Sequence, residues 1–239
     1  MALQPWRTGK IIRIADETPN TKRYWFQLPE IENFDFKPGQ FVQLEFPIHE
    51  QHSKRLRSYS IASWPDGSNV FELLIVLNEA GAGTTWLFAN AVEGTEIPVR
   101  GAMGVFTLPA IIDKDLFFIC TGTGIAPFRS MAHYIQQHNI PHKNIYLLFG
   151  TRKREDLLYY DELKQLQEDC PGFHFIPTLS REEWEGRSGY VHPIYEELCS
   201  SKQEAGFYLC GWKAMIDETK KRIMELGYDK KAIHQELYG

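Results

Sequence analysis

The sequence predicts a β-barrel followed by a parallel α/β domain, and two observations lead to this prediction. Over about the first hundred residues, short segments of alternating apolar and polar side chains are separated by turn signals such as Lys37-Pro38-Gly39. From Asp115 onward, apolar runs of strand length alternate with helical segments, the pattern of an α/β fold. A chain of 239 residues is long enough for two compact domains. We therefore expect residues 1–110 to form the barrel and residues 111–239 to form the α/β domain.

Six segments of the first region have the composition and the period-two alternation of β-strands. They are Lys10–Ile14, Lys22–Leu28, Gln40–Phe46, Arg57–Ser63, Val70–Leu77 and Thr95–Val99. Short strands at this spacing are typical of an antiparallel barrel. One helix, expected over Thr84–Ala91, interrupts them. Gly101 and Gly104 then allow the backbone to approach closely where the barrel closes.

The second region contains strand and helix candidates in alternation. The strand candidates are Leu116–Cys120, Ile145–Gly150, Phe173–Leu179, Phe207–Cys210 and Ala232–Tyr238. The helix candidates are Phe128–His138, Tyr160–Glu168, Pro193–Cys199 and Lys213–Leu226. Right-handed crossovers between them would give a five-stranded parallel Rossmann-like sheet with helices on both faces.

The composition argues against several classes of function. A net charge of −5 suits nucleic acid poorly, because binding to phosphates requires a positive surface. No apolar run is long enough to span a membrane, and the N-terminus lacks the features of a signal peptide. The four cysteines and eight histidines lack the spacing of metal or iron–sulfur ligands. We expect a cytoplasmic monomer with reduced thiols and no bound metal.

The segment Arg57-Ser58-Tyr59-Ser60 is the first candidate site. On a strand, Arg57 and Tyr59 would lie on one face, with Ser58 and Ser60 on the other. Such a group can hold a flat ring system that carries phosphates. The arginine would pair with diphosphate oxygens, the tyrosine would stack, and Ser60 would hydrogen-bond a ring nitrogen. The same residues also occur on ordinary edge strands, where the arginine lies along the surface.

A glycine-rich segment, Gly81-Ala82-Gly83, precedes the helix expected in the barrel region. Glycines that lead into a helix leave its first backbone N–H groups exposed, and these groups can bind a diphosphate. A plain helix cap explains the same residues equally well.

A second glycine-rich turn, Thr121-Gly122-Thr123-Gly124-Ile125-Ala126-Pro127, follows a strand and opens a helix. This is the context of a turn that binds nucleotide phosphates. The turn departs from the dinucleotide fingerprint, because Pro127 stands where the third glycine is expected. The second strand also lacks the terminal acidic residue that would bind a ribose 2′-hydroxyl, and Arg152 follows it instead.

Further arginines follow the third strand, in Ser180-Arg181 and at Arg187. Arginines at strand ends suit a 2′-phosphate better than a free hydroxyl. Two or three charge-assisted hydrogen bonds would favour the phosphorylated dinucleotide by about a hundredfold. The alternative is that these are surface arginines in loops. The sequence therefore favours NADPH and leaves NADH open.

Two segments near the C-terminus add weaker signals. Cys210-Gly211 ends the fourth strand at the carboxyl edge, where ligands of open α/β sheets bind. By default, Cys210 would be a small buried apolar residue. The chain then ends in Glu236-Leu237-Tyr238-Gly239, and a terminal aromatic residue often only fills space.

Together, six motifs in this order resemble those of the ferredoxin–NADP reductase family. They are Arg57-x-Tyr59-Ser60, Gly101-x-x-Gly104-x-Phe106, Thr121–Pro127, Ser180-Arg181, Cys210-Gly211 and Glu236-Leu237-Tyr238. The resemblance covers Gly39 to Gly239 and implies that the barrel binds FAD and the α/β domain binds the pyridine nucleotide. Family members with their own iron–sulfur domain carry a cysteine cluster that this sequence lacks.

The resemblance implies roles in FAD binding. Arg57, with Ser58 beside it, would contact the diphosphate. Tyr59 would stack on the isoalloxazine and Ser60 would lie near its N5 atom. The other residues expected at the diphosphate are Gly83, Thr84 and Thr85.

The resemblance also implies roles in nucleotide binding and electron transfer. The nucleotide diphosphate would contact Thr121, Gly122 and Gly124, and the 2′-phosphate would contact Ser180 and Arg181, with Arg152 and Arg187 nearby. The catalytic candidates, beside the nicotinamide and N5, are Ser60, Cys210 and Glu236. Tyr238 would shield the other flavin face, although Gly239 extends the chain beyond it.

The implied activity is electron transfer between NADP(H) and ferredoxin or flavodoxin through FAD, in either direction. One alternative is an NAD(P)H-dependent reductase component of an oxygenase. Another is a flavin-binding regulatory subunit without turnover. Lys54 and Arg55 flank the flavin strand, and we expect them to attract an acidic carrier.

Overall fold

The computed structural model of the protein describes residues 4–237. The chain forms two compact units. The first contains the residues up to Leu108 together with residues 129–134, and the second contains residues 109–128 and those from Ile135 onward. Within the described part of the chain, no helix is long and apolar enough to cross a membrane.

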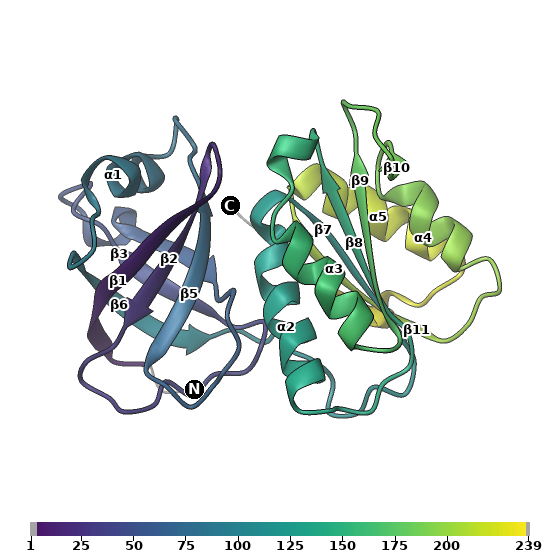
Figure 1. The fold of residues 1–239 in the computed structure, drawn as a ribbon, viewed down its shortest axis with the longest axis horizontal. Coiled ribbons are helices and arrows are strands. Elements are labelled where there is room, and N and C mark those ends of the chain that lie inside the picture. Colours follow the sequence, from purple (N-terminus) through teal and green to yellow (C-terminus); the bar gives the residue numbers. More distant parts are fainter. Residues whose placement is uncertain (1–3, 238–239) are drawn as a thin grey trace. The chain divides into compact units, whose positions relative to one another are not determined.

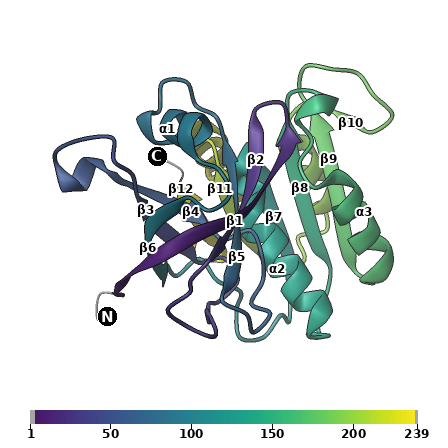
Figure 2. The same ribbon diagram turned by 60° about the vertical axis from the view of Figure 1, so that its left-hand side comes forward.

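The first unit is a six-stranded antiparallel sheet closed into a barrel (Figures 1 and 2). Its strands are β1 (Trp6–Thr18), β2 (Thr21–Gln27), β3 (Phe41–Glu45), β4 (Leu56–Ser60), β5 (Val70–Val76) and β6 (Glu96–Met103). They follow the order β4-β3-β6-β1-β2-β5. A bridge between Ile61 and Leu73 joins the end of β4 to β5, and the Ala62 N–H donates to the Glu72 carbonyl at 2.8 Å. These links close the sheet and confirm the predicted antiparallel barrel.

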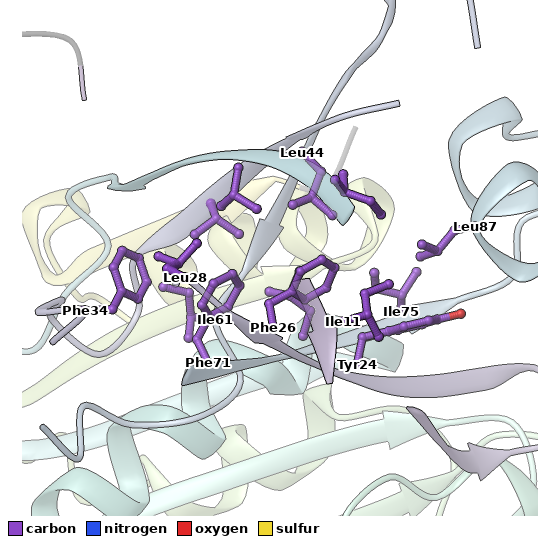
Figure 3. Close-up of a cluster of buried hydrophobic side chains, with 14 of the residues drawn as sticks. Ile11, Tyr24, Phe26, Leu28, Phe34, Leu44, Ile61, Phe71, Ile75 and Leu87 are labelled. Carbon is purple, nitrogen blue, oxygen red and sulfur yellow. The ribbon is translucent and has the colours of Figure 1, made fainter. Parts of the chain in front are cut away.

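Alternating side chains of the barrel strands fill its interior (Figure 3). On β2, Tyr24 and Phe26 point inward, and the Phe26 ring stacks on that of Phe71 at 5.5 Å. Fully burying one such side chain stabilises the fold by about 1.5–3 kcal/mol. Leu87 of helix α1 (Ala82–Asn90) joins the same cluster. Helix α1 is thereby anchored to the barrel.

Several boundaries in the barrel differ from the predicted ones: β4 ends at Ser60 instead of Ser63, and β6 continues to Met103 instead of Val99. Strand β1 is longer than expected, because its first part pairs with β6 and its remainder pairs with β2. Helix α1 begins two residues earlier than expected, because Gly81 is its N-cap residue. The predicted element types are otherwise those of the structure.

The middle of helix α2 (Ala126–Gln137) belongs to the first unit through Arg129. The buried Arg129 guanidinium donates to the Ala62 carbonyl at 2.9 Å and to the Glu72 carboxylate at 3.2 Å. Arg23 pairs with the same carboxylate at 2.7 Å, and the Arg129 guanidinium lies over the Trp64 ring. The buried Glu72 is therefore compensated by two arginines, as a buried charge requires.

The second unit is a six-stranded parallel sheet. Its strands are β7 (Asp115–Thr121), β8 (Ile145–Thr151), β9 (Phe173–Leu179), β10 (Arg187–Ser188), β11 (Ala205–Gly211) and β12 (Ile233–Leu237), in the order β10-β9-β8-β7-β11-β12. Five of these are the predicted strands. The sixth, β10, was not predicted, because two residues are too few for a recognisable period.

Helices cover both faces of this sheet (Figure 1). Helices α2 and α3 (Tyr160–Asp169) lie on one face, and α4 (His192–Leu198) and α5 (Lys213–Glu225) lie on the other. Neighbouring side chains of β7 serve opposite faces: Phe118 stacks on Phe128 of α2, whereas Phe117 belongs to the cluster under α4 and α5. Short 3₁₀ turns complete the chain at His52–Lys54, Gly122–Ile125, Arg154–Asp156 and Lys230–Ala232.

Candidate functional site

Strand β4 carries the first set of candidate residues. Its register with β3 places Arg57 opposite Leu44 and Tyr59 opposite Val42. Because Leu44 and Val42 are buried core residues, Arg57 and Tyr59 lie on the same, inner face of the sheet. Ser58 is exposed, whereas Ser60 is buried. The strand therefore separates Arg57 and Tyr59 from the two serines, as its period of two requires.

Tyr59 is held firmly at the edge of the barrel core. Its ring meets that of Phe46 edge-on, with the centroids 6.4 Å apart. Burial raises the pKa of Tyr59 to about 12, and the nearby Arg57 guanidinium partly offsets this rise. The phenol therefore stays neutral at physiological pH.

Arg57 lies against the start of helix α1. A Cβ atom at Gly83 would lie 3.0 Å from the Arg57 Cγ atom, so only glycine lets the arginine pass this close. Helix α1 has no side-chain N-cap bond, which leaves its first N–H groups available. Within residues 4–237, no acidic side chain pairs with Arg57, whose Nη1 atom donates to the carbonyls of Lys54 and Leu56. A guanidinium beside a helix N-terminus fits the diphosphate of FAD.

The hydroxyls of the two threonines of α1 hydrogen-bond the loop that precedes the helix. The Thr84 hydroxyl donates to the Asn78 carbonyl at 2.9 Å and accepts the Asn78 N–H at 3.1 Å. The Thr85 hydroxyl lies 3.4 Å from the carbonyls of Asn78 and Glu79. Both hydroxyls thus hold the loop before the helix, and these bonds leave the first backbone N–H groups of α1 unused.

The second glycine-rich turn lies at the carboxyl end of β7. Residues Gly122–Ile125 form a single 3₁₀ turn that leads into α2, with Thr121 at its start. A Cβ atom at Gly124 would lie 2.7 Å from the carbonyl carbon of Cys210 and 2.8 Å from the Gly211 nitrogen. The turn therefore approaches the end of β11 more closely than any other residue type would allow.

Cys210 and Glu236 are neighbours at the same edge. The parallel registers place Cys210 beside Cys120 of β7 on one side and beside Glu236 of β12 on the other. Cys210 is fully buried, whereas Glu236 is partly exposed. Burial, and to a lesser extent Cys210, raises the pKa of the Cys120 thiol. Tyr238, the remaining catalytic candidate, lies outside the described residues.

A pocket of about 600 Å³ lies beyond the carboxyl ends of β8 and β9. The backbones of Ser180 and Arg181 donate to the carbonyls of Thr151 and Arg152, both at 2.9 Å, and join the two loops. The pocket is lined by Lys153, Arg154, Glu155, Arg181 and Glu182. Lys153 and Arg154 were not among the predicted site residues. The basic run from Arg152 to Arg154 was the signal for them.

Two other arginines named in the sequence analysis, Arg187 and Arg55, bind groups outside this pocket. Arg187 does not line this pocket but forms a two-pronged ion pair with Glu197, at 2.7 and 3.3 Å. The hydrogen bond to Glu197 raises the pKa of Arg187. Arg55 donates to the carbonyls of His49 and Glu50 at 2.6 and 3.0 Å, so it braces the loop between β3 and β4.

Two family models match the chain, one in each half of the sequence. The oxidoreductase FAD-binding domain matches residues 8–108, and the oxidoreductase NAD-binding domain matches residues 118–221. Ferredoxin–NADP reductase B of Sorangium cellulosum is 32% identical over an alignment of 239 positions that covers 96% of each chain. The chain belongs to the ferredoxin–NADP reductase family. It is an oxidoreductase that binds FAD and a pyridine nucleotide.

Three further proteins resemble the chain. The glycine betaine monooxygenase reductase subunit of Pseudomonas aeruginosa is 29% identical over 99% of this chain, which spans 66% of that subunit. The fold matches a Neisseria gonorrhoeae ferredoxin NADP+ reductase with bound FAD and NADP at a TM-score of 0.80, with 28% identity, over 98% of this chain and 99% of that one. It also matches the Amycolatopsis cytochrome P450 reductase GcoB at 0.88, with 28% identity, over 100% and 72% of the two chains.

Proposed function

We propose that this family member oxidises NADPH and passes electrons to ferredoxin or flavodoxin, and that the reaction can run in either direction. FAD supplies the conversion between a two-electron hydride and single electrons. The chain holds and orients the partners of that conversion. Arg57 and the first N–H groups of α1 would hold the FAD diphosphate, with Tyr59 against the isoalloxazine and Ser60 near N5.

In the second unit, the turn from Thr121 to Gly124 would receive the diphosphate of the nucleotide. Cys210 and Glu236, which are neighbours in register, would orient the nicotinamide. Because they lie side by side on neighbouring strands, both residues could contact the same ring, and orientation of a reacting ring requires more than one contact. Tyr238 would shield the flavin, as the family resemblance implies.

The observation that carries the choice of NADPH is the pocket beyond β8 and β9. Three cations, Lys153, Arg154 and Arg181, and two carboxylates line it. Lys153 pairs with Glu155 and Arg154 with Glu185, so a 2′-phosphate would compete with these exposed carboxylates. Each charge-assisted hydrogen bond contributes about 1.5–3 kcal/mol, which is about 10- to 100-fold in affinity. A 2′-phosphate would therefore be favoured over a 2′-hydroxyl there.

The test combines anaerobic spectral titration of the FAD-loaded protein with steady-state kinetics for both nucleotides. We expect NADPH to reduce the flavin with the higher kcat/KM. We expect Arg181→Ala to raise the KM for NADPH about tenfold and to leave the weaker NADH activity nearly unchanged. Lys230→Ala is the matched control, because this exposed lysine lies before β12, at the amino ends of the parallel strands and therefore at the edge of the sheet opposite to the pocket. A parallel loss with both nucleotides would contradict the assignment of Arg181.

The second candidate function is that of a reductase component of an oxygenase system. The two carboxylates of the pocket favour this function, because a carboxylate can accept a hydrogen bond from the free ribose hydroxyl of NADH. One of them, Glu182, already accepts the backbone N–H of Arg154 at 2.9 Å. Relatives of this kind, such as the glycine betaine monooxygenase reductase subunit, also match the chain. Equal efficiency with NADH and NADPH, together with slow reduction of ferredoxin and flavodoxin, would favour this function.

A further inference from the structure

Trp212 stands apart from the other tryptophans of the protein. Its side chain is 69% exposed. Within residues 4–237 its ring has no aromatic, cation–π or hydrogen-bonding partner. Each of the other five has one: Arg100 for Trp6, Arg13 for Trp25, His133 for Trp64, Phe46 for Trp86 and the Arg187 carbonyl for Trp184.

Local structure does not explain a tryptophan at this position. Trp212 is the N-cap residue of α5, where serine, threonine, aspartate or asparagine would stabilise the helix by accepting a backbone N–H. The tryptophan makes no such bond, and it buries little of its own surface. Neither the helix nor the core therefore benefits from the indole ring.

The backbone of Trp212 is nevertheless tied to the candidate nucleotide turn. Its N–H donates to the Thr121 hydroxyl oxygen at 3.1 Å, which leaves the hydroxyl hydrogen of Thr121 free to donate elsewhere. Directly before it, Cys210 and Gly211 lie against Gly124. The indole is thus anchored at the edge of the turn that runs from Thr121 to Gly124.

We infer that the Trp212 side chain contacts the pyridine nucleotide bound at this turn. The inference depends on the proposed binding of the nucleotide diphosphate there. An indole offers a flat apolar face and one N–H donor, which match the flat rings and the polar sugar edges of a dinucleotide. An exposed ring on a fixed backbone loses little conformational freedom when the ligand covers it.

The experiment measures NADP+ binding to the oxidised, FAD-loaded protein by calorimetry and by tryptophan fluorescence. We expect Trp212→Ala to weaken NADP+ binding about tenfold, as loss of a stacked ring does. We expect Trp212→Phe to keep the affinity within about threefold, because a flat ring is retained, and to lose most of the NADP+-induced fluorescence change. Met224→Ala, at an exposed apolar residue of the same helix, is the control and should bind as the parent does.

An unchanged Kd for Trp212→Ala would overturn the inference. So would an NADP+-induced fluorescence change that persists in Trp212→Phe, a result that can be obtained even if the alanine variant is unstable. An unchanged Kd with slower reduction of ferredoxin would assign the indole to carrier docking and would also overturn it. If the parent protein does not bind NADP+ but binds NAD+, the preference for NADPH fails, and the same measurements with NAD+ then test Trp212 separately.

Discussion

Gly124 lies directly against the backbone of Cys210, on a strand that comes much later in the sequence. A Cβ atom at position 124 would be 2.7 Å from the Cys210 carbonyl carbon. Backbone atoms cannot move aside as a flexible side chain can. The contact therefore links the shape of the turn from Thr121 to Gly124 to the position of the cysteine.

We predict that Gly124→Ala weakens NADP+ binding at least about tenfold, because the turn must move away from β11, at a cost of about 1–3 kcal/mol. Calorimetry on the FAD-loaded protein measures this. Gly206→Ala, near the other end of β11, is the control, because its added Cβ meets the end of the Leu116 side chain rather than backbone. It should leave the Kd for NADP+ unchanged. Wild-type affinity in Gly124→Ala would show that the turn does not bind the nucleotide.

Gly83 and Arg57 support a second prediction. In Gly83→Ala the new methyl group would press on the Arg57 side chain, 3.0 Å away, and shift the guanidinium. We expect FAD to dissociate about tenfold more readily, since one charge-assisted contact is weakened. Flavin released on dilution, followed by its fluorescence, measures the effect. Ala89→Gly destabilises the same helix by about 1 kcal/mol without touching Arg57, and should retain FAD.

The buried pair of Arg129 and Glu72 supports a third prediction, on stability. Arg129→Met removes one of the two arginines that compensate Glu72, and should lower the free energy of unfolding by about 3 kcal/mol. Urea unfolding monitored by circular dichroism measures this. Arg23→Met removes the more exposed partner and should cost less, about 1 kcal/mol. Equal losses of unfolding free energy in the two variants would contradict the prediction that Arg129 contributes more to stability than Arg23 does.

A fourth prediction concerns pH. Burial lowers the pKa of His192 below its ordinary value of 6.5, although Glu218 and Glu196 favour the charged form; Arg222 acts in the same direction as burial. The unfolded chain therefore binds the proton at higher pH than the folded chain does. The stabilising effect of a neutral His192 is present above pH 6.5 and is lost as the pH falls below that value. Its ring accepts or donates a hydrogen bond at the Tyr195 hydroxyl, 3.0 Å away.

We expect His192→Gln to make the free energy of unfolding less dependent on pH between about pH 6.5 and 5, the range in which an ordinary histidine titrates. Urea unfolding at several pH values measures the slope. The pKa of His234 is also lowered, mainly by burial, so part of the slope should persist in the single variant. A slope identical to that of the parent would contradict the contribution of His192.

The element types of both units were predictable from the sequence. The alternation on β2 and the apolar runs of β7 and β8 are local patterns that need no knowledge of distant residues. The exceptions have physical causes. Strand β10 is too short to show a period, and β1 owes its length to pairing with β6.

The candidate site was predictable only in part, because a residue's availability depends on its neighbours in space. Arg187 followed the expected strand, but Glu197 engages it. Lys153 and Arg154 line the pocket, and each of them is also ion-paired, with Glu155 and with Glu185. The hydroxyls of Thr84 and Thr85 hold a loop, and Gly83 of the same helix lies beside Arg57.

The sequence by itself determined the succession of strands and helices along the chain and the positions of the two glycine-rich turns. It could do so because the local backbone conformation follows local side-chain chemistry. The tertiary structure alone decided that Gly83 meets Arg57, that Gly124 meets Cys210, and that Trp212 keeps its ring uncovered. These relationships join segments far apart in the chain. They arise only when strand pairing and core packing bring those segments together.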